Sequence, residues 1–264
     1  MHAGARRVLV RRYESLASEP KCPSNRTTYY SRMRLGALFS SGKDSTLALY
    51  EAMQRGYEVE CLITVESENP YSFMFHTPNV HLARLQAEAM QLPLVVRGTA
   101  GREEEELADL KAAVGAAVEN FGIEGVVAGA VLSNYQRRRI EKVCRELSLD
   151  VVLPLWGRDQ KELLTKLLEE GFEVIFTAVA AYGFDKSWLG ARLDEERVKQ
   201  LTTLHAKYGV SIVGEGGEFE TLVLDAPPFK KRLEILECYV LEEDAHTARL
   251  IIKKATLVDK LDSL

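Results

Sequence analysis

The segment FSSGKDS at residues 39–45 constrains the fold most, because it joins a short apolar run to a helical pattern. Residues 34–39 are typical of a buried strand, and residues 45–55 repeat apolar side chains at helical spacing. Small residues at such a junction let the backbone approach an anion, toward which the first amides of the helix also point. We therefore expect a phosphate-binding turn at the carboxyl end of the first strand of a parallel sheet.

Alternating strand and helix patterns continue up to residue 157. The spacing predicts further strands at 58–65, 94–97, 125–129 and 151–155, and helices at 79–90, at 104–119 and after Ser133. Ser133 and Gln136 form a capping box at the start of the last of these helices. Strands separated by helices of this length pair in parallel through right-handed crossovers. Residues 33–157 are thus expected to form an α/β domain with a doubly wound parallel sheet.

The pattern changes beyond residue 157. The sequence predicts helices at 160–169 and 194–208, a strand at 173–180, and extended segments at 220–224, 232–241 and 247–255. Residues 158–264 are expected to form a second, α+β domain that binds the substrate. Residues 1–32 are rich in Arg and Ser and have no periodic apolar face, so we interpret them as a disordered or misassigned extension that precedes a true start at Met33.

The composition indicates an ordinary cytoplasmic globular protein. Hydrophobic residues make up 46% of the chain, charged residues 28%, and the net charge is −5, which gives no reason to expect direct nucleic-acid binding. No apolar run reaches the roughly 18 residues of a membrane span. The four cysteines form no CxxC pair and no zinc-binding spacing, which favours reduced thiols.

The turn at residues 39–45 differs from the common phosphate-loop motifs. Ala37 and Asp44 stand where a Walker A motif requires Gly and Ser or Thr, and the dinucleotide GxGxxG pattern is absent. Lys43 supplies a point positive charge for a phosphate group. Asp44 has two interpretations, as a ligand of Mg²⁺ or as an acid that interacts favourably with the helix dipole.

Three other stretches carry chemistry-bearing side chains. His76 and Asn79 lie in FHTPN, where a structural histidine is the plainer interpretation of His76. Gly129 begins the stretch GAVLSNYQR, whose arginine run is either a solvated face or a patch that attracts an anionic substrate. Residues 214–221, GEGGEFET, combine three glycines with three carboxylates; taken alone, this stretch is typical of a glycine-rich hairpin with solvated acids.

Taken together, these stretches resemble one family. SSGKDS resembles the SGGKDS loop of PP-loop (HUP-like) ATP pyrophosphatases, with Ser41 in place of a Gly. With GEGGEFETLVLDAP, HTPN and PLW at residues 154–156, the chain from about residue 33 to 229 resembles the diphthine–ammonia ligases. This resemblance implies that ATP adenylates the diphthine carboxylate of elongation factor 2, that pyrophosphate leaves, and that ammonium supplies the nitrogen of the amide.

The resemblance also implies roles for individual residues. It implies a catalytic role for Lys43, Asp44, Glu215 and Glu218, with Mg²⁺ on Asp44. ATP is expected to contact Ser40, Ser41, Gly42, Lys43, Asp44, Ser45, His76 and Gly129. The acceptor is expected to contact Asn79, Tyr135, Gln136, Arg137, Gly216, Gly217, Glu220 and Thr221. We further hypothesise that Glu215 or Glu218 recognises the trimethylammonium group of diphthine, since a carboxylate complements that cation.

Two other functions remain open on the sequence alone. One is a different PP-loop ligase, for example one that modifies tRNA, or a bacterial relative with another acceptor. The other is a nucleotide-binding regulator on a similar α/β core. A ligase releases pyrophosphate in the presence of its acceptor and ammonium, whereas a regulator binds ATP without sustained release.

Overall fold

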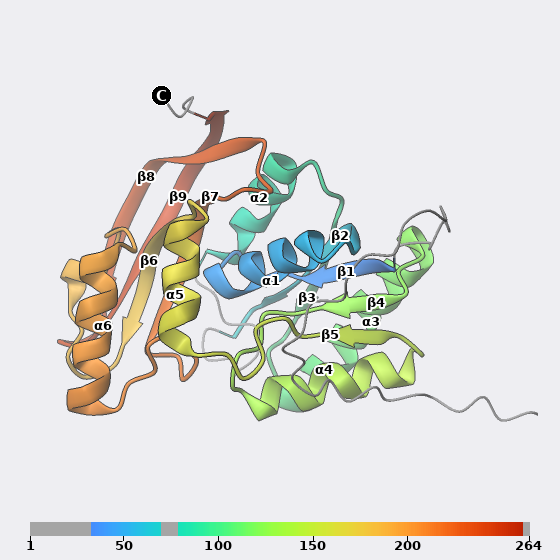
Figure 1. The fold of residues 1–264 in the computed structure, drawn as a ribbon, viewed down its shortest axis with the longest axis horizontal. Helices are drawn as coiled ribbons and strands as arrows, with labels where there is room; N and C mark the ends of the chain where they lie inside the picture. Colours follow the sequence, from blue (N-terminus) through green and yellow to red (C-terminus); the bar gives the residue numbers. More distant parts are fainter. Residues whose placement is uncertain (1–32, 70–78, 261–264) are drawn as a thin grey trace, which may run out of the picture. The chain divides into compact units, whose positions relative to one another are not determined.

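A parallel sheet of five strands forms the first half of the chain in the computed structural model, which describes residues 33–69 and 79–260 (Figure 1). The sheet order is β3-β2-β1-β4-β5, and every neighbouring pair is parallel. The strands are β1 (Arg34–Leu38), β2 (Glu58–Ser67), β3 (Leu94–Thr99), β4 (Gly125–Val127) and β5 (Asp150–Val152). This order is that of a doubly wound sheet, as the sequence predicts.

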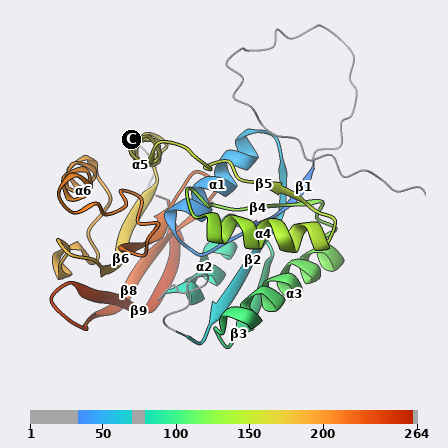
Figure 2. The same cartoon turned by 90° about the horizontal axis from the view of Figure 1, so that it is seen from below.

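Helices cover both faces of the parallel sheet because its strands carry apolar side chains on both sides. Helices α3 (Glu103–Phe121) and α4 (Asn134–Glu146) pack on one face, against Cys61, Ile63 and Val65 of β2. Figure 2 shows these two helices next to each other. Helix α1 (Lys43–Gln54) and helix α2 (Ala83–Met90), which follows the short 3₁₀ helix η1 (Val80–Leu82), pack on the other face.

A separate antiparallel sheet forms the second half of the described chain, in the order β7-β6-β9-β8. Its elements are α5 (Gln160–Glu169), β6 (Glu173–Ala180), the 3₁₀ helix η2 (Lys186–Trp188), α6 (Glu195–Tyr208), β7 (Phe219–Asp225), β8 (Lys231–Glu242) and β9 (Thr247–Asp259). Figure 1 shows α5 and α6 along this sheet. The predicted fold class, α/β with a second part of mixed helix and strand, is confirmed.

One continuous apolar core connects the two sheets. Leu47 and Leu49 of α1 belong to the same buried cluster as Leu164 of α5 and Phe176 of β6. The core therefore does not end at residue 157, and residues 33–69 and 79–260 belong to one compact unit. The division into domains at residue 158 stays a prediction, and the interpretation of residues 1–32 lies outside the described residues.

The start of α1 and the end of β9 differ from the bounds that the sequence pattern predicts. Helix α1 begins at Lys43, two residues earlier than its apolar periodicity indicates, because Gly42 takes the extended N-cap position. Strand β9 continues to Asp259 because β8 pairs with it along its full length, from Lys231 to Glu242. In residues 33–69 and 79–260, no helix combines the length and apolar character needed to cross a membrane.

Candidate active site

The order of the parallel strands reverses between β1 and β4, and the turns that follow these two strands lie side by side. A Cβ atom added to Gly129 would lie 2.6 Å from the carbonyl carbon of Asp44, so only glycine lets the two turns approach so closely. Open α/β sheets bind ligands at this reversal, outside the carboxyl ends of the strands. Gly129 thus lies after β4 with the backbone of the first turn of α1 as its close neighbour, and its contact with ATP stays a prediction.

Side-chain hydrogen bonds hold the phosphate loop, residues 40–45, in a closed shape. The hydroxyl of Ser45 accepts hydrogen bonds from the amide and the hydroxyl of Ser40, each at 3.2 Å, and lies 3.1 Å from the Gly42 carbonyl. Ser41 adopts φ +70°, a left-handed conformation that favours glycine. The related motif has Gly at this position, so Ser41 introduces backbone strain that the sequence alone did not reveal.

The edge strand β7 of the second sheet completes this loop. The amide of Val223 donates to the Ser41 carbonyl at 3.1 Å, and the amide of Lys43 donates to the Thr221 hydroxyl at 3.2 Å. The side chain of Gln86 donates to the carbonyls of both Ser41 and Val223, at 3.1 and 2.8 Å. Thr221, predicted to contact the acceptor, therefore holds the loop, and Gln86 is a residue that sequence reasoning missed.

The ammonium group of Lys43 is buried between the two halves of the chain. Its Nζ donates to the Val213 carbonyl at 2.5 Å and to Asp44 Oδ2 at 2.6 Å, and it lies 5.3 Å from the centre of the Phe219 ring. The Lys43 side chain is only 3% exposed. The positive charge that Lys43 was expected to offer a phosphate group is thus engaged by protein groups, and its role toward phosphate stays a prediction.

The carboxylate of Asp44 suits a Mg²⁺ ion whose other ligands are phosphate oxygens and water. One oxygen binds Lys43, and the side chain is 33% exposed, so the carboxylate is reachable from solvent. Within the described residues, no group of three or more His, Cys, Asp and Glu side chains could hold a metal ion. Mg²⁺ usually binds through one or two carboxylates together with phosphate oxygens and water, which fits this single acid beside a phosphate loop.

Glu215 binds the turn between β4 and α4. Its carboxylate accepts hydrogen bonds from the amides of Val131, Leu132 and Ser133 at 3.0, 2.6 and 2.9 Å. These amides precede the first turn of α4, where a carboxylate is favourable. The geometry therefore gives Glu215 a structural task, and the hypothesis that it recognises the acceptor cation has no support from its contacts.

Glu218 closes the glycine-rich turn in the same way. Its two carboxylate oxygens accept hydrogen bonds from the amides of Ser211 and Gly216, at 2.7 and 2.8 Å. Gly216 and Gly217 are exposed, and Gly217 adopts φ +83°. Glu218 is thus committed to backbone amides as Glu215 is, which leaves Glu220 as the acid of this segment with an unused oxygen.

Asn79 joins the two sheets. Its side-chain amide donates to the Leu250 carbonyl at 2.9 Å, and its side-chain oxygen accepts from the Ile252 amide at 3.0 Å. It therefore satisfies backbone groups of β9 as a paired strand would. Asn79 is 1% exposed. A contact with the acceptor, as predicted, does not fit this buried position. His76 lies outside the described residues.

The start of α4 carries stacked arginines near the carboxyl end of β4. Ser133 caps the helix as predicted by accepting a hydrogen bond from the Gln136 amide at 3.3 Å, but the Ser133 amide donates to Glu215 and not to the Gln136 side chain, so only half of the predicted capping box forms. The Arg137 guanidinium lies 4.3 Å from the Trp156 ring centre, and that of Arg139 lies 3.7 Å from the Tyr135 ring centre. The predicted contact of Tyr135, Gln136 and Arg137 with the acceptor stays a prediction.

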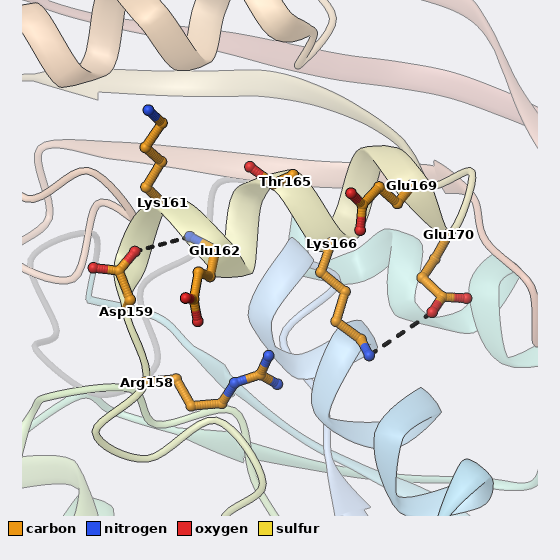
Figure 3. A pocket seen from close by; sticks show the side chains of 8 residues that line it. All are labelled: Arg158, Asp159, Lys161, Glu162, Thr165, Lys166, Glu169 and Glu170. Atoms are coloured by element: carbon orange, nitrogen blue, oxygen red, sulfur yellow. Dashed lines mark hydrogen bonds and ion pairs between the residues drawn. The ribbon is translucent and has the colours of Figure 1, made fainter.

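A hollow of about 430 Å³ lies along α5, and charged side chains line most of it (Figure 3). Asp159 caps the helix, while Lys166 forms an ion pair with Glu170. Arg158 and Lys166 also pair with Glu51, which is buried in α1. We assign the pairs of Arg158 and Lys166 with Glu51 to joining α1 with α5.

The buried cysteines are poor nucleophiles. Burial raises the pKa of Cys61 and of Cys144 to about 12, so both stay protonated at neutral pH. Covalent catalysis through these two thiols does not fit the structure.

Comparison with known proteins identifies the family. Residues 33–151 match the family model of the diphthamide synthase N-terminal domain, and residues 159–258 match that of its C-terminal domain. The chain belongs to the diphthine–ammonia ligase family. Members of this family are ATP-dependent ligases, which is consistent with a phosphate loop at the strand-order reversal.

Several curated diphthine–ammonia ligases are similar along most of their length. The protein from Mus musculus is 36% identical over 254 residues, covering 88% of this chain and 95% of that protein. The Homo sapiens protein is 36% identical over 255 residues with the same coverage. The Rattus norvegicus protein is 39% identical over 222 residues, covering 77% of this chain and 83% of that protein.

Proposed function

We propose that this chain converts diphthine on elongation factor 2 to diphthamide, using ATP, Mg²⁺ and ammonium. The observation that carries the proposal is that both halves match the diphthine–ammonia ligase family while the second half supplies the contacts that complete the phosphate loop. The proposed products are the amide, AMP and pyrophosphate.

The residues of the chain divide the chemical work. A carboxylate reacts poorly with an amine until its oxygen becomes part of a good leaving group, which adenylation provides. The phosphate loop and the amino end of α1 would stabilise the charge that develops on the departing pyrophosphate. Asp44 would hold Mg²⁺, which supplies charge neutralisation on the phosphates when bound. Glu215 would keep the turn before α4 in place, and Glu218 the glycine-rich turn.

A defined reaction tests the proposal. The protein is incubated with diphthine-bearing elongation factor 2, ATP, Mg²⁺ and ammonium, and the factor is then analysed by mass spectrometry. We expect the diphthine residue to lose the small mass that replacing a carboxyl oxygen by nitrogen removes, with one pyrophosphate released per amide. Release of pyrophosphate without the factor, or no change in the factor, would contradict the proposal.

A further inference from the structure

The ring of Phe219 belongs to the glycine-rich segment, yet it faces the ammonium group of Lys43 in the phosphate loop. The Lys43 Nζ atom lies 5.3 Å from the ring centre, which is within the range of a cation–π contact. Both residues are only 3% exposed, so the attraction acts where water is largely excluded. The segment therefore reaches the phosphate loop through an aromatic side chain as well as through its backbone.

Strand β7 holds Lys43 at two points from one face. Side chains two residues apart on a strand lie on the same face, and this face of β7 carries Phe219 and Thr221. The Thr221 hydroxyl accepts a hydrogen bond from the Lys43 amide at 3.2 Å, while the Phe219 ring lies against the ammonium group. The backbone of Lys43 and the far end of its side chain are thus held by the same strand.

The Phe219 ring is itself fixed by the apolar core. It contacts the rings of Phe176 and Phe184, with ring centres 5.2 and 5.9 Å apart. Both of these neighbours are buried. A ring packed among other buried rings has little freedom to reorient. The position of the ring against Lys43 is therefore set by the protein core and does not depend on a ligand.

The Val213 carbonyl is a further contact of the ammonium group from the same part of the chain. It accepts a hydrogen bond from Lys43 Nζ at 2.5 Å, and the next residue, Gly214, adopts φ +75°. A Cβ atom at Gly214 would lie 2.9 Å from the Phe219 carbonyl oxygen and 3.0 Å from its ring. Glycine at this position thus lets the Val213 carbonyl and the Phe219 ring reach the ammonium group together.

The protein uses only part of the hydrogen-bonding capacity of the Lys43 ammonium group. A lysine ammonium has three N–H donors. The Val213 carbonyl takes one of them and Asp44 Oδ2, at 2.6 Å, takes another. One donor therefore remains for a phosphate oxygen. Because the two hydrogen bonds and the ring fix the orientation of the group, they also fix the direction of this third N–H.

We propose that Phe219 is a positioning residue for the reaction: its ring and the Val213 carbonyl hold the Lys43 ammonium group so that its third N–H meets the departing pyrophosphate. This inference rests on the proposed function. A donor that is already in place costs no reorganisation when charge develops in the transition state. A lysine side chain is flexible along its four-carbon stem, so its head group needs such a support.

Replacing Phe219 by Leu removes the ring face and keeps an apolar side chain. With the factor and ammonium present, we expect kcat for pyrophosphate release to fall about 10-fold, as loss of a desolvated cation–π contact does. KM for ATP should change little, because the contact of Thr221 with the loop remains. The rates are measured at a temperature at which every variant is folded.

Phe172→Leu is the matched control. Phe172 is also buried, and its ring packs edge-on against Tyr50 with ring centres 5.8 Å apart. Among the described residues, the ring that Lys43 contacts is that of Phe219 and not that of Phe172. The control therefore loses a similar aromatic contact without touching the ammonium group, and its kcat should equal that of the wild type. An equal loss of kcat in both variants would overturn the proposal.

A double-mutant cycle decides whether Phe219 acts through the ammonium group. Lys43→Met removes that group, so Phe219→Leu should lower kcat by less than about 2-fold in the Lys43→Met background. A 10-fold loss in both backgrounds would show that Phe219 acts independently of Lys43 and would overturn the positioning role. Unchanged kcat in Phe219→Leu alone, or a raised KM for ATP at unchanged kcat, would overturn it as well.

Stability supplies a readout that does not depend on activity. Lys43→Met and Phe219→Leu remove the same contact, so the double variant should lose less free energy of unfolding in urea than the two single losses add up to. Phe172→Leu combined with Lys43→Met should give additive losses. Additive losses for the Phe219 pair, with amidation of the factor intact in the wild type, would overturn the role of Phe219 alone. If the wild-type protein forms no amide on the factor, both proposals fall.

Discussion

The amide of Val223 donates a hydrogen bond to the carbonyl of Ser41, so an edge strand of the second sheet holds the phosphate loop of the first. The left-handed conformation of Ser41 is fixed at this contact. Neither sheet on its own therefore contains a complete loop, and mutations on either side should affect nucleotide binding.

Replacing Ser41 by Gly should stabilise the protein. Ser41 has φ +70°, and its buried hydroxyl has no partner among the described residues. Glycine relieves the left-handed strain, worth about 1–2 kcal/mol, although its freer unfolded state takes back about half of that gain. We expect a net increase of about 1 kcal/mol in the free energy of unfolding, measured in urea. A decrease would mean that the hydroxyl makes a favourable contact.

Replacing Gln86 by Met should loosen the loop. The change keeps the length of the side chain but removes both hydrogen bonds to Ser41 and Val223. Two buried carbonyls each lose a donor, so we expect a loss of about 1–3 kcal/mol in stability and a higher KM for ATP. Gln54→Met, at an exposed position of α1, is the control. An unchanged KM for ATP in the Gln86 variant would mean that the contacts of β7 are enough to hold the conformation of the phosphate loop.

Replacing Lys43 by Met should reduce turnover by about 10²–10³-fold, as loss of a transition-state contact does. The change also leaves the Val213 carbonyl and Asp44 without their partner, so the melting temperature should fall too. Pyrophosphate release at saturating ATP measures the first effect. Lys199→Met on the exposed face of α6 should change neither quantity. Unchanged release would remove Lys43 from the mechanism and leave it a purely structural residue.

Replacing Glu215 by Ala should destabilise the protein without a specific effect on the acceptor. Three amides at the start of α4 lose their acceptor, and hydrogen bonds to a charged group contribute about 1.5–3 kcal/mol each. Since solvent can replace part of this, we expect a loss of about 2–3 kcal/mol. Glu215→Gln should keep most of the stability and an unchanged KM for the factor. A raised KM in that variant, at normal stability, would restore the cation-recognition hypothesis.

Replacing Glu51 by Gln should make the free energy of unfolding depend less on pH below pH 4.5. Burial alone would raise the pKa of Glu51, but Arg158, Lys166 and Arg55 together lower it below its ordinary 4.5. Its contribution is thus fully present above pH 4.5 and is lost as pH falls through the lower, folded-state pKa. At pH 7 the variant should lose about 3 kcal/mol. Urea melts from pH 3 to 7 measure both effects; parallel curves would contradict the assignment.

Whether the sequence predicts the role of a residue depends on how far along the chain its contact partner lies. The capping of α4 by Ser133 was predictable because its partner, Gln136, is three residues away. The alternation of strands and helices likewise predicted a doubly wound parallel sheet, because each element follows from its own local pattern. The roles of Glu215 and Gln86 were not predictable, because their partners lie tens of residues away and no local pattern distinguishes a buried polar side chain from a solvated one.

The predicted site residues fall into two groups, those at the strand-order reversal and those buried between the two sheets. The loop 40–45 and Gly129 meet at the strand-order reversal, where general rules of α/β sheets place a ligand. Asn79 and Thr221 belong to motifs that are easily read as binding segments, yet both are buried in contacts between the two sheets. A motif therefore indicates a region of the chain without indicating whether each of its side chains faces a ligand or the protein.

The contact between Lys43 and Thr221 spans 178 residues, which has a consequence for synthesis on the ribosome. The loop emerges early, but the strand that completes it appears only near the end of translation. A nascent chain therefore carries the loop sequence for most of its synthesis without the groups that give the loop its final form. Tight nucleotide binding should begin only after β7 has left the exit tunnel, so it would report that folding of the whole chain is complete.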